Sequence, residues 1–345
     1  MNINKDREKV LDIAKGLGII LVVLGHSIQF GNGSDYANKT LFFSNSVFIV
    51  IYSFHMSLFC SISGYLFSKS IRIHSSKQII KEKFNRLVVP IFFWTLLYTI
   101  YLLAVSVIRD GAGIYMKSFL KLFVSNFFSS QWFLWAMFYF SIMVVFVNFV
   151  FKDSIFVYIL IYLLLFFVKI NGNDYFVSSY ISNFPAFIIA YLYGKKHAER
   201  KVLELMGSNS LVVIFNVVLY TILLLLKYIG AVNKLSYYGE RLYYIFTGLS
   251  GTVVILWIIS NIYRTYINAK IWGIFEYLGS RTLGIYVIAG YIDIELLQRI
   301  TRNVSASIAV NVIETIVVIV SSLAIIEIIK KIPLLNKLLL GDISA

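Results

Sequence analysis

Residues 10 to 30, VLDIAKGLGIILVVLGHSIQF, decide the fold, because this stretch is apolar and long enough to cross a bilayer as a helix. The stretch nevertheless contains Asp12, Lys15 and His26. A charge at the centre of a membrane costs about 2.5 to 3.5 kcal/mol, so such groups usually face a protein interior or a water-filled cavity. These ionisable residues therefore indicate a functional site inside the membrane.

Lys15 and His26 lie on one face of this predicted helix. His26 follows Lys15 by eleven positions, and at about 100° per residue the second side chain points within about 20° of the first. A rise of about 1.5 Å per residue separates them by about 16 Å along that face. Asp12 comes one turn before Lys15 and is placed to pair with it. One stripe thus joins a cation near the membrane surface to an imidazole deep in the bilayer.

The composition predicts an all-α, polytopic integral membrane protein. The chain is 59% hydrophobic and 14% charged, whereas soluble domains are about 45 to 50% apolar and 25% charged. The single cysteine, Cys60, excludes a disulfide framework and a cysteine metal site. The net charge of +14 is expected in cytoplasmic loops that face anionic lipid or an anionic cofactor, and nucleic acid is not an expected partner.

Ten apolar stretches predict about ten transmembrane helices within a single domain, residues 1–345. They are residues 10–30, 41–68, 87–108, 132–151, 154–168, 180–194, 211–226, 242–263, 271–297 and 305–329. The basic segments 69–86 and 195–201 then fall on the same side as the C-terminal lysines, which places both termini in the cytoplasm. A basic start before an apolar run also describes a signal peptide, but the ionisable residues inside the first stretch favour a retained helix.

Two histidines reach a similar predicted depth. His55 lies about 21 Å from the cytoplasmic edge at Lys69, and His26 lies about 24 Å from the edge near Val10, at about 1.5 Å per residue. Antiparallel helices joined by a short loop are normally neighbours. We therefore expect His26 and His55 to line one cavity.

Three successive segments resemble the signatures of the acyltransferase 3 family, in its fucose 4-O-acetylase-like branch. They are LDIAKGLGIILVVLGHS at residues 11–27, YSFHMSLFCSISGYLF at 52–67 and KFNRLVVPIFFW at 83–94. The family has a basic residue ten intervening positions before a histidine in its first span, which Lys15 and His26 match. The first two segments, taken together, make the resemblance specific to this family.

The other family features are matched in chain order. A phenylalanine-rich run ends in Ser63 and Gly64, and two basic residues, Lys83 and Arg86, precede the third span. Later segments also resemble the family: QWFLWAMF at residues 131–138, LGSRTLGIYVI at 278–288 and IPLLNKLLLG at 332–341. The resemblance thus covers nearly the whole chain.

The resemblance implies a multi-pass O-acyltransferase of the plasma membrane that uses no metal. Its donor would be cytoplasmic acetyl-CoA, and its acceptor a hydroxyl of a surface or lipid-linked glycan. Coenzyme A is polyanionic, so Lys83, Arg86 and Lys15 are candidates to bind its phosphates, and Ser63 is assigned to the same coenzyme site.

His26 is the candidate general base, because an imidazole with a pKa near 6.5 suits removal of a hydroxyl proton at neutral pH. The other two catalytic candidates are Lys15 and His55, and His55 orients His26, binds the acceptor or bridges helices.

Simpler interpretations stand beside these. Intramembrane histidines often bridge helices, Ser63 and Gly64 suit close helix packing, and Lys83 with Arg86 also fixes topology. Trp132 is expected to anchor the membrane interface. Two other functions remain open: a glycan or lipid-linked sugar flippase that uses the same polar cavity without chemistry, and a polysaccharide polymerase. The short predicted outer loops weaken the polymerase interpretation.

Overall fold

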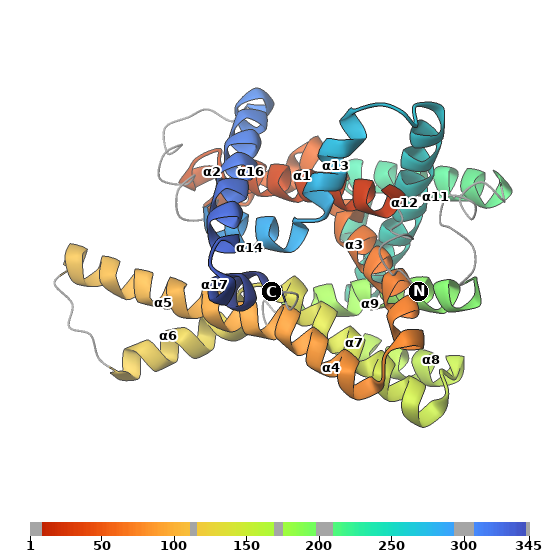
Figure 1. Cartoon of the computed structure of the whole chain (residues 1–345). Helices are drawn as coiled ribbons and strands as arrows, with labels where there is room; N and C mark the ends of the chain where they lie inside the picture. The colour runs from red at the N-terminus through yellow and green to blue at the C-terminus, as the bar shows by residue number, and fades with distance from the viewer. Residues whose placement is uncertain (1–8, 111–115, 169–174, 198–209, 293–306, 343–345) are drawn as a thin grey trace.

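The computed structural model describes residues 9–110, 116–168, 175–197, 210–292 and 307–342, and all regular elements within these ranges are helical. In chain order they are α1 Lys9–Phe30, α2 Ser34–Asn38, η2 Leu41–Ser44, α3 Ser46–Ile73, α4 Ser76–Lys83, η3 Phe84–Val88, α5 Val89–Asp110, α6 Met116–Ser129, α7 Trp132–Phe151, α8 Ile155–Phe166, α9 Tyr175–Lys196, α11 Ser210–Tyr228, η4 Ala231–Lys234, α12 Tyr237–Thr265, α13 Ile271–Gly279, α14 Thr282–Ile292, α16 Ile308–Lys330 and α17 Pro333–Leu340 (Figure 1). The prediction of an all-α polytopic bundle is confirmed.

Seven helices in the described part of the chain are long and apolar enough to cross a membrane. They are α1, α3, the continuous helix Ser76–Arg109, α7, α11, α12 and α16. The helices α8 and α14 are apolar but shorter, and α9 contains Pro185. The total of ten spans and the cytoplasmic position of both termini stay predictions.

The predicted ninth span, residues 271–297, is wrong as a single helix. The chain forms α13, turns at Ser280 and continues as α14, and residues 293–297 lie outside the described part. At the turn, Gly279 lies directly against the backbone of Asp12, where a Cβ atom would come within 1.9 Å of the Asp12 carbonyl oxygen. The break therefore follows from packing against α1, which a hydropathy pattern does not contain.

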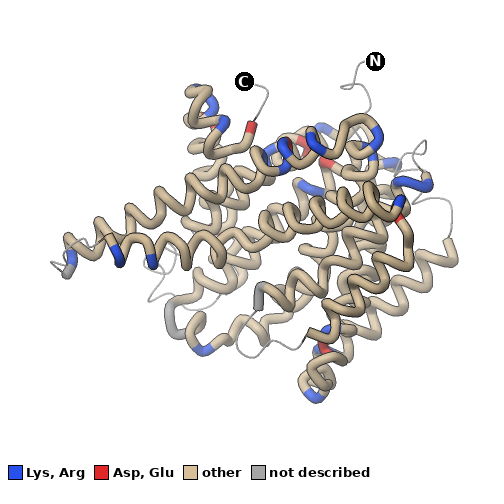
Figure 2. The backbone as a smooth tube through the Cα atoms, turned by 90° about the horizontal axis from the view of Figure 1, so that it is seen from below, with Lys and Arg blue, Asp and Glu red and all other residues tan. Residues whose placement is uncertain are grey.

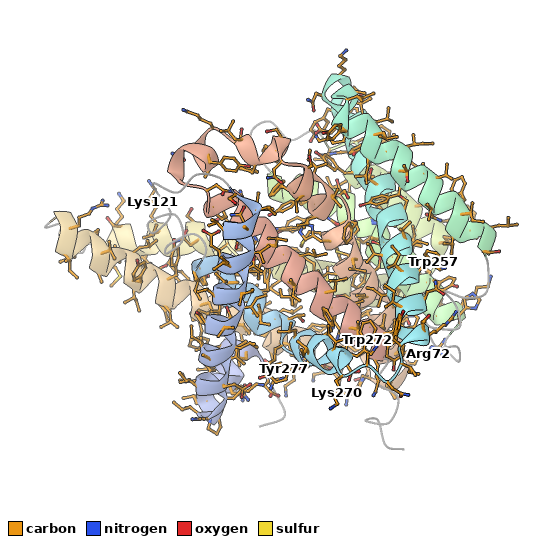
Figure 3. All side chains as sticks on the ribbon, turned by 90° about the horizontal axis from the view of Figure 1, so that it is seen from above. Arg72, Lys121, Trp257, Lys270, Trp272 and Tyr277 are labelled. Carbon is orange, nitrogen blue, oxygen red and sulfur yellow. The ribbon has the colours of Figure 1, made fainter. Side chains whose placement is uncertain are left out.

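The predicted outer loop at residues 109–131 contains a helix, α6. Its phenylalanines at positions 119, 123 and 127 stack in a row at helical spacing, with centroid distances of 6.2 and 5.8 Å. Figure 1 shows that α5 and α6 form a hairpin that extends beyond the rest of the bundle, and Figure 3 shows Lys121 on that hairpin.

The first helix lies at the centre of the packing. It contacts α3, α13, α14 and α16, and Gly16 brings it against the backbone of Phe275 on α13. On the neighbouring helix, Gly64 brings α3 equally close to Phe187 on α9. Small residues allow such close approach of membrane helices, so these glycines fix the positions of α1 and α3, which carry the two histidines.

Lys and Arg positions along the backbone lie mostly near helix ends, and they are most numerous along one edge of the molecule (Figure 2). At that end, an Arg72 guanidinium nitrogen donates to the Lys195 carbonyl oxygen. Figure 3 shows Arg72 at the same end of the bundle as Lys270 and Tyr277. The start of the segment 195–201 thus lies beside the segment 69–86, as the charge pattern predicts. We call the end of the bundle that contains Arg72, Lys195 and Lys270 the basic end.

Candidate functional site

The stripe on α1 begins with a close ion pair. The Lys15 ammonium lies 2.6 Å from an Asp12 carboxylate oxygen, and the Asp12 side chain is buried. This is the pairing that the sequence predicts. The carboxylate holds the ammonium in place on the first turns of α1, near the basic end, where Lys9 also lies 4.0 Å from Glu276.

Farther along α1, the ring of His26 stacks on Phe30, with centroids 5.9 Å apart and planes 9° apart. Its Nδ1 atom is buried and has no hydrogen-bond partner within the described residues. A buried polar atom without a partner costs free energy, so an open ring nitrogen at this depth is a candidate to meet substrate.

His55 on α3 is buried, with 3% of its surface exposed. Its Nδ1 atom lies 2.8 Å from the Ile51 carbonyl oxygen. Because a carbonyl oxygen can only accept, Nδ1 carries the proton, and the Nε2 atom of the neutral ring is an acceptor. The ring also packs edge-on against Tyr52, with the ring centroids 4.6 Å apart.

A cavity of about 320 Å³ opens beside His55 at the end of α3 opposite the basic end. It is bounded mainly by α3, α9 and α12, and we call it the α3–α12 cavity. Its lining is aromatic (Phe43, Phe48, Tyr52, Phe54, Trp132, Tyr237, Tyr243, Tyr244), hydroxylated or amidic (Ser53, Ser57, Ser178, Ser179, Ser182, Asn183), charged (Lys227, Glu240, Arg241), and completed by His55, Ile49 and Met56. Aromatic faces with hydroxyl and amide groups suit a polar, uncharged ring such as a sugar.

Trp132 also lines this cavity, and its role as an interface anchor stays a prediction. His55 reaches the cavity, but His26 is not among the described residues that line it. The two histidines thus lie on neighbouring helices, and only one of them contacts this space.

The four residues assigned to the coenzyme lie apart from this cavity. The Lys83 ammonium sits 5.3 Å from the centre of the Phe67 ring, and Arg86 pairs with Glu82 at 3.1 Å. Arg86 lies in η3, a π-helical segment of the kind often found at functional sites. Of the described residues that line the α3–α12 cavity, none is Lys15, Ser63, Lys83 or Arg86.

A buried polar cluster joins α1 to α16 next to His26, and the sequence analysis missed it. The Asn311 amide donates to the Ser27 carbonyl oxygen at 3.2 Å and to a Glu314 carboxylate oxygen at 3.0 Å. The other oxygen of Glu314 is buried without a partner in the part of the chain that the structure describes. The signal was present, because a glutamate within a predicted span is a candidate functional group in its own right.

Known proteins resemble this chain in two ways. A family profile described as an acyltransferase domain matches residues 8–330. The nodulation protein NolL of Sinorhizobium fredii is 36% identical over 131 residues, 38% of this chain and 34% of the relative. NolL of Mesorhizobium japonicum is 34% identical over 137 residues, 39% of this chain and 34% of the relative.

The matched region thus spans about a third of the length of these curated relatives. No solved structure matches the chain. The family match, in contrast, extends from the start of α1 to the end of α16 and includes both histidine-bearing helices. This chain therefore belongs to the acyltransferase 3 family.

Proposed function

We propose that the protein is an O-acyltransferase that moves an acetyl group from cytoplasmic acetyl-CoA to a hydroxyl of a cell-surface or lipid-linked glycan, in the plasma membrane. The observation that carries this proposal is the α3–α12 cavity, whose lining suits a sugar and includes a histidine. The cavity lies at the end of α3 opposite the basic end. A donor and an acceptor could therefore enter from opposite sides and meet near the histidines.

The donor would bind at the basic end. Coenzyme A carries several phosphate charges, which Lys and Arg side chains bind by charge-assisted hydrogen bonds. Lys83 lies over an aromatic ring, and the Arg86 side chain is 59% exposed. An exposed ion pair contributes little stability, so Arg86 can leave Glu82 for a phosphate at small cost. Lys15 would add a further positive charge for the phosphates, and Ser63 would donate to the thioester carbonyl.

The reaction needs one proton to move. The acceptor hydroxyl oxygen attacks the thioester carbonyl carbon while His26 removes the hydroxyl proton. The resulting oxyanion then re-forms the carbonyl and expels the coenzyme A thiolate, which takes the proton back from the imidazolium. His55, with Nε2 as an acceptor, would hold the incoming hydroxyl before the transfer.

The experiment is a thiol-release assay on the purified chain in detergent. Acetyl-CoA is mixed with a sugar acceptor, and free coenzyme A thiol is measured with a coloured thiol reagent. The single cysteine, Cys60, is buried, so the background from the protein is small. We expect acceptor-dependent release that disappears in His26→Gln. Folded protein without acceptor-dependent release across a panel of sugars would favour the flippase instead.

A further inference from the structure

Arg241, near the start of α12, is a buried cation at the wall of the α3–α12 cavity, with 2% of its surface exposed. Its Nη1 atom donates to the carbonyl oxygens of Phe166 and Val168, and its Nη2 atom donates to the Tyr237 hydroxyl. Its Nε atom is buried without a hydrogen-bond partner among the described residues. The structure also shows no carboxylate within ion-pair distance of Arg241 in the described ranges.

Helix capping explains only part of this arrangement. The carbonyls of Phe166 and Val168 lie at the end of α8, where a cation is favourable. That role accounts for Nη1. It does not account for the Nε atom, nor for a buried charge that has no counter-ion among the described residues, which is costly in a folded protein.

A second cation lines the same cavity. The Lys227 ammonium lies 5.8 Å from the centre of the Tyr244 ring, and the charged lining residues are Lys227, Arg241 and Glu240. Among the described lining residues, two positive charges and one negative charge give a net charge of +1. An anionic group on a ligand would therefore neutralise this net positive charge.

The position of Arg241 relates this group to the histidine. Gly248, two turns further along α12, lies against the Ser57 hydroxyl, two residues from His55. Seven residues at about 1.5 Å each place Arg241 about 10 Å along α12 from that level. Arg241 and His55 thus lie at different levels of the cavity, so one ligand can bind Arg241 with one group and reach His55 with another.

We propose that the acceptor carries an anionic group, a carboxylate or a phosphate, which binds Arg241 while the reacting hydroxyl lies at His55. This rests on the proposed function for the identity of the ligand as acceptor. A carboxylate would come from an acidic sugar, and a phosphate from the lipid-linked end of a glycan. Both accept charge-assisted hydrogen bonds from a guanidinium.

The test measures binding without an acyl donor, so it does not depend on acyl transfer. The full chain in neutral detergent is titrated with methyl glucuronide, glucose 1-phosphate and uncharged methyl glucoside, and binding is followed by saturation-transfer NMR. We expect at least one anionic probe to bind about tenfold more tightly than the glucoside, the effect of about one charge-assisted hydrogen bond. The preferred probe identifies the source of the anion, and its advantage should shrink at high salt.

Variants assign the effect to Arg241. Arg241→Gln should reduce the ratio of anionic-probe affinity to glucoside affinity to about one, whereas Arg241→Lys should retain part of that ratio. Lys234→Gln is the matched control, because this exposed lysine precedes α12 but does not line the cavity. If Arg241→Gln does not fold, two other measurements test the proposal: the anionic advantage should be smaller in Lys227→Gln, and in the wild type it should shrink at high salt. Equal binding of all three probes, or an anionic advantage that survives Arg241→Gln, overturns the proposal.

Discussion

The Nδ1 atom of His55 donates to the carbonyl oxygen of Ile51, one turn earlier on the same helix, at 2.8 Å. This bond fixes the tautomer and aims the acceptor nitrogen, Nε2, away from the helix backbone. His26 has no such bond, since its Nδ1 atom is buried without a partner in the described structure. The two rings therefore differ: a backbone carbonyl orients the His55 ring, whereas the His26 ring interacts with the Gln29 side chain and keeps an unpartnered Nδ1 atom among the described residues.

Gly64 should tolerate no larger residue. A Cβ atom there would lie 2.1 Å from the Phe187 carbonyl oxygen, a backbone atom that cannot rotate away. Gly64→Ala should therefore destabilise the protein by about 1 to 3 kcal/mol, as overpacking usually does. Gly273→Ala is the control, because no atom lies within 4 Å of its added Cβ, and alanine favours a helix. Melting temperatures in one detergent compare them, and equal shifts would contradict close packing of α3 on α9.

The orientation of the bundle can be tested by cysteine labelling. In a Cys60→Ser background, Ser75→Cys at the start of α4 should be shielded from an impermeant thiol reagent in intact cells, because the basic end faces the cytoplasm in our prediction. Ser34→Cys, in the first predicted outer loop, should react. Permeabilised cells supply the control, since both positions should then be labelled. Labelling of Ser75→Cys from outside would reverse the orientation.

Replacing both Lys83 and Arg86 with Gln should raise the KM for acetyl-CoA about tenfold and change kcat less. This pattern reports lost ground-state binding, here of phosphate charges. Lys81→Gln is the matched control, because this exposed lysine lies in the same basic segment. An unchanged KM for acetyl-CoA with normal membrane insertion would indicate that Lys83 and Arg86 serve only to fix the membrane topology.

Asp153, in the turn between α7 and α8, should make stability depend on pH. Its burial would raise the carboxyl pKa, but hydrogen bonds from Lys195, Tyr191, Asn148 and Tyr158 favour the carboxylate and hold the pKa of Asp153 below its usual value. A lowered pKa in the folded state contributes stability above the unfolded pKa of about 3.9. That contribution is lost as pH falls through the lower, folded value.

Asp153→Asn should abolish this pH dependence and lower the free energy of unfolding at pH 7 by about 2 kcal/mol, the scale of lost hydrogen bonds to a charged group. Melting temperatures between pH 3 and pH 7 measure both effects. Glu276→Gln serves as a control, because its ion pair with Lys9 is long and partly exposed. A wild-type curve that matches the Asn variant at acid pH and at neutral pH alike would rule out a role for the Asp153 charge.

Most of the helices were predictable, because a spanning helix needs about 20 apolar residues and leaves that pattern in the sequence. The predicted span 132–151 coincides with α7. The break between α13 and α14 was not predictable in this way, because apolar residues continue through it and its cause is the contact of Gly279 with Asp12.

The α3–α12 cavity was also not predictable from the sequence, because it depends on how separate helices pack. Its lining comes from separate helices: α3 contributes serines and aromatic residues, α9 mainly serines and α12 mainly tyrosines, all of which are ordinary in membrane helices. Of the described lining residues, the sequence pointed to His55 as a site residue, from its depth, and to Trp132 only as an interface anchor. Arg241 precedes the predicted span 242–263 by one residue, so the sequence pattern is that of a charged residue in a flanking loop. In the structure its side chain is buried.

The roles of the two histidines can be separated by the same substitution at each. Glutamine keeps the size and some hydrogen bonding of histidine but cannot take a proton. His26→Gln should therefore lower kcat by about 10² to 10⁴, the usual contribution of a positioned base, with little change in melting temperature. His55→Gln can still accept from a hydroxyl, so we expect a raised acceptor KM and a smaller loss of kcat. Activity per folded protein is the decisive measurement. If His26→Gln retains more than about a tenth of wild-type activity, against the loss expected for a base, while His55→Gln is inactive, then His55 is the base and His26 has a supporting role.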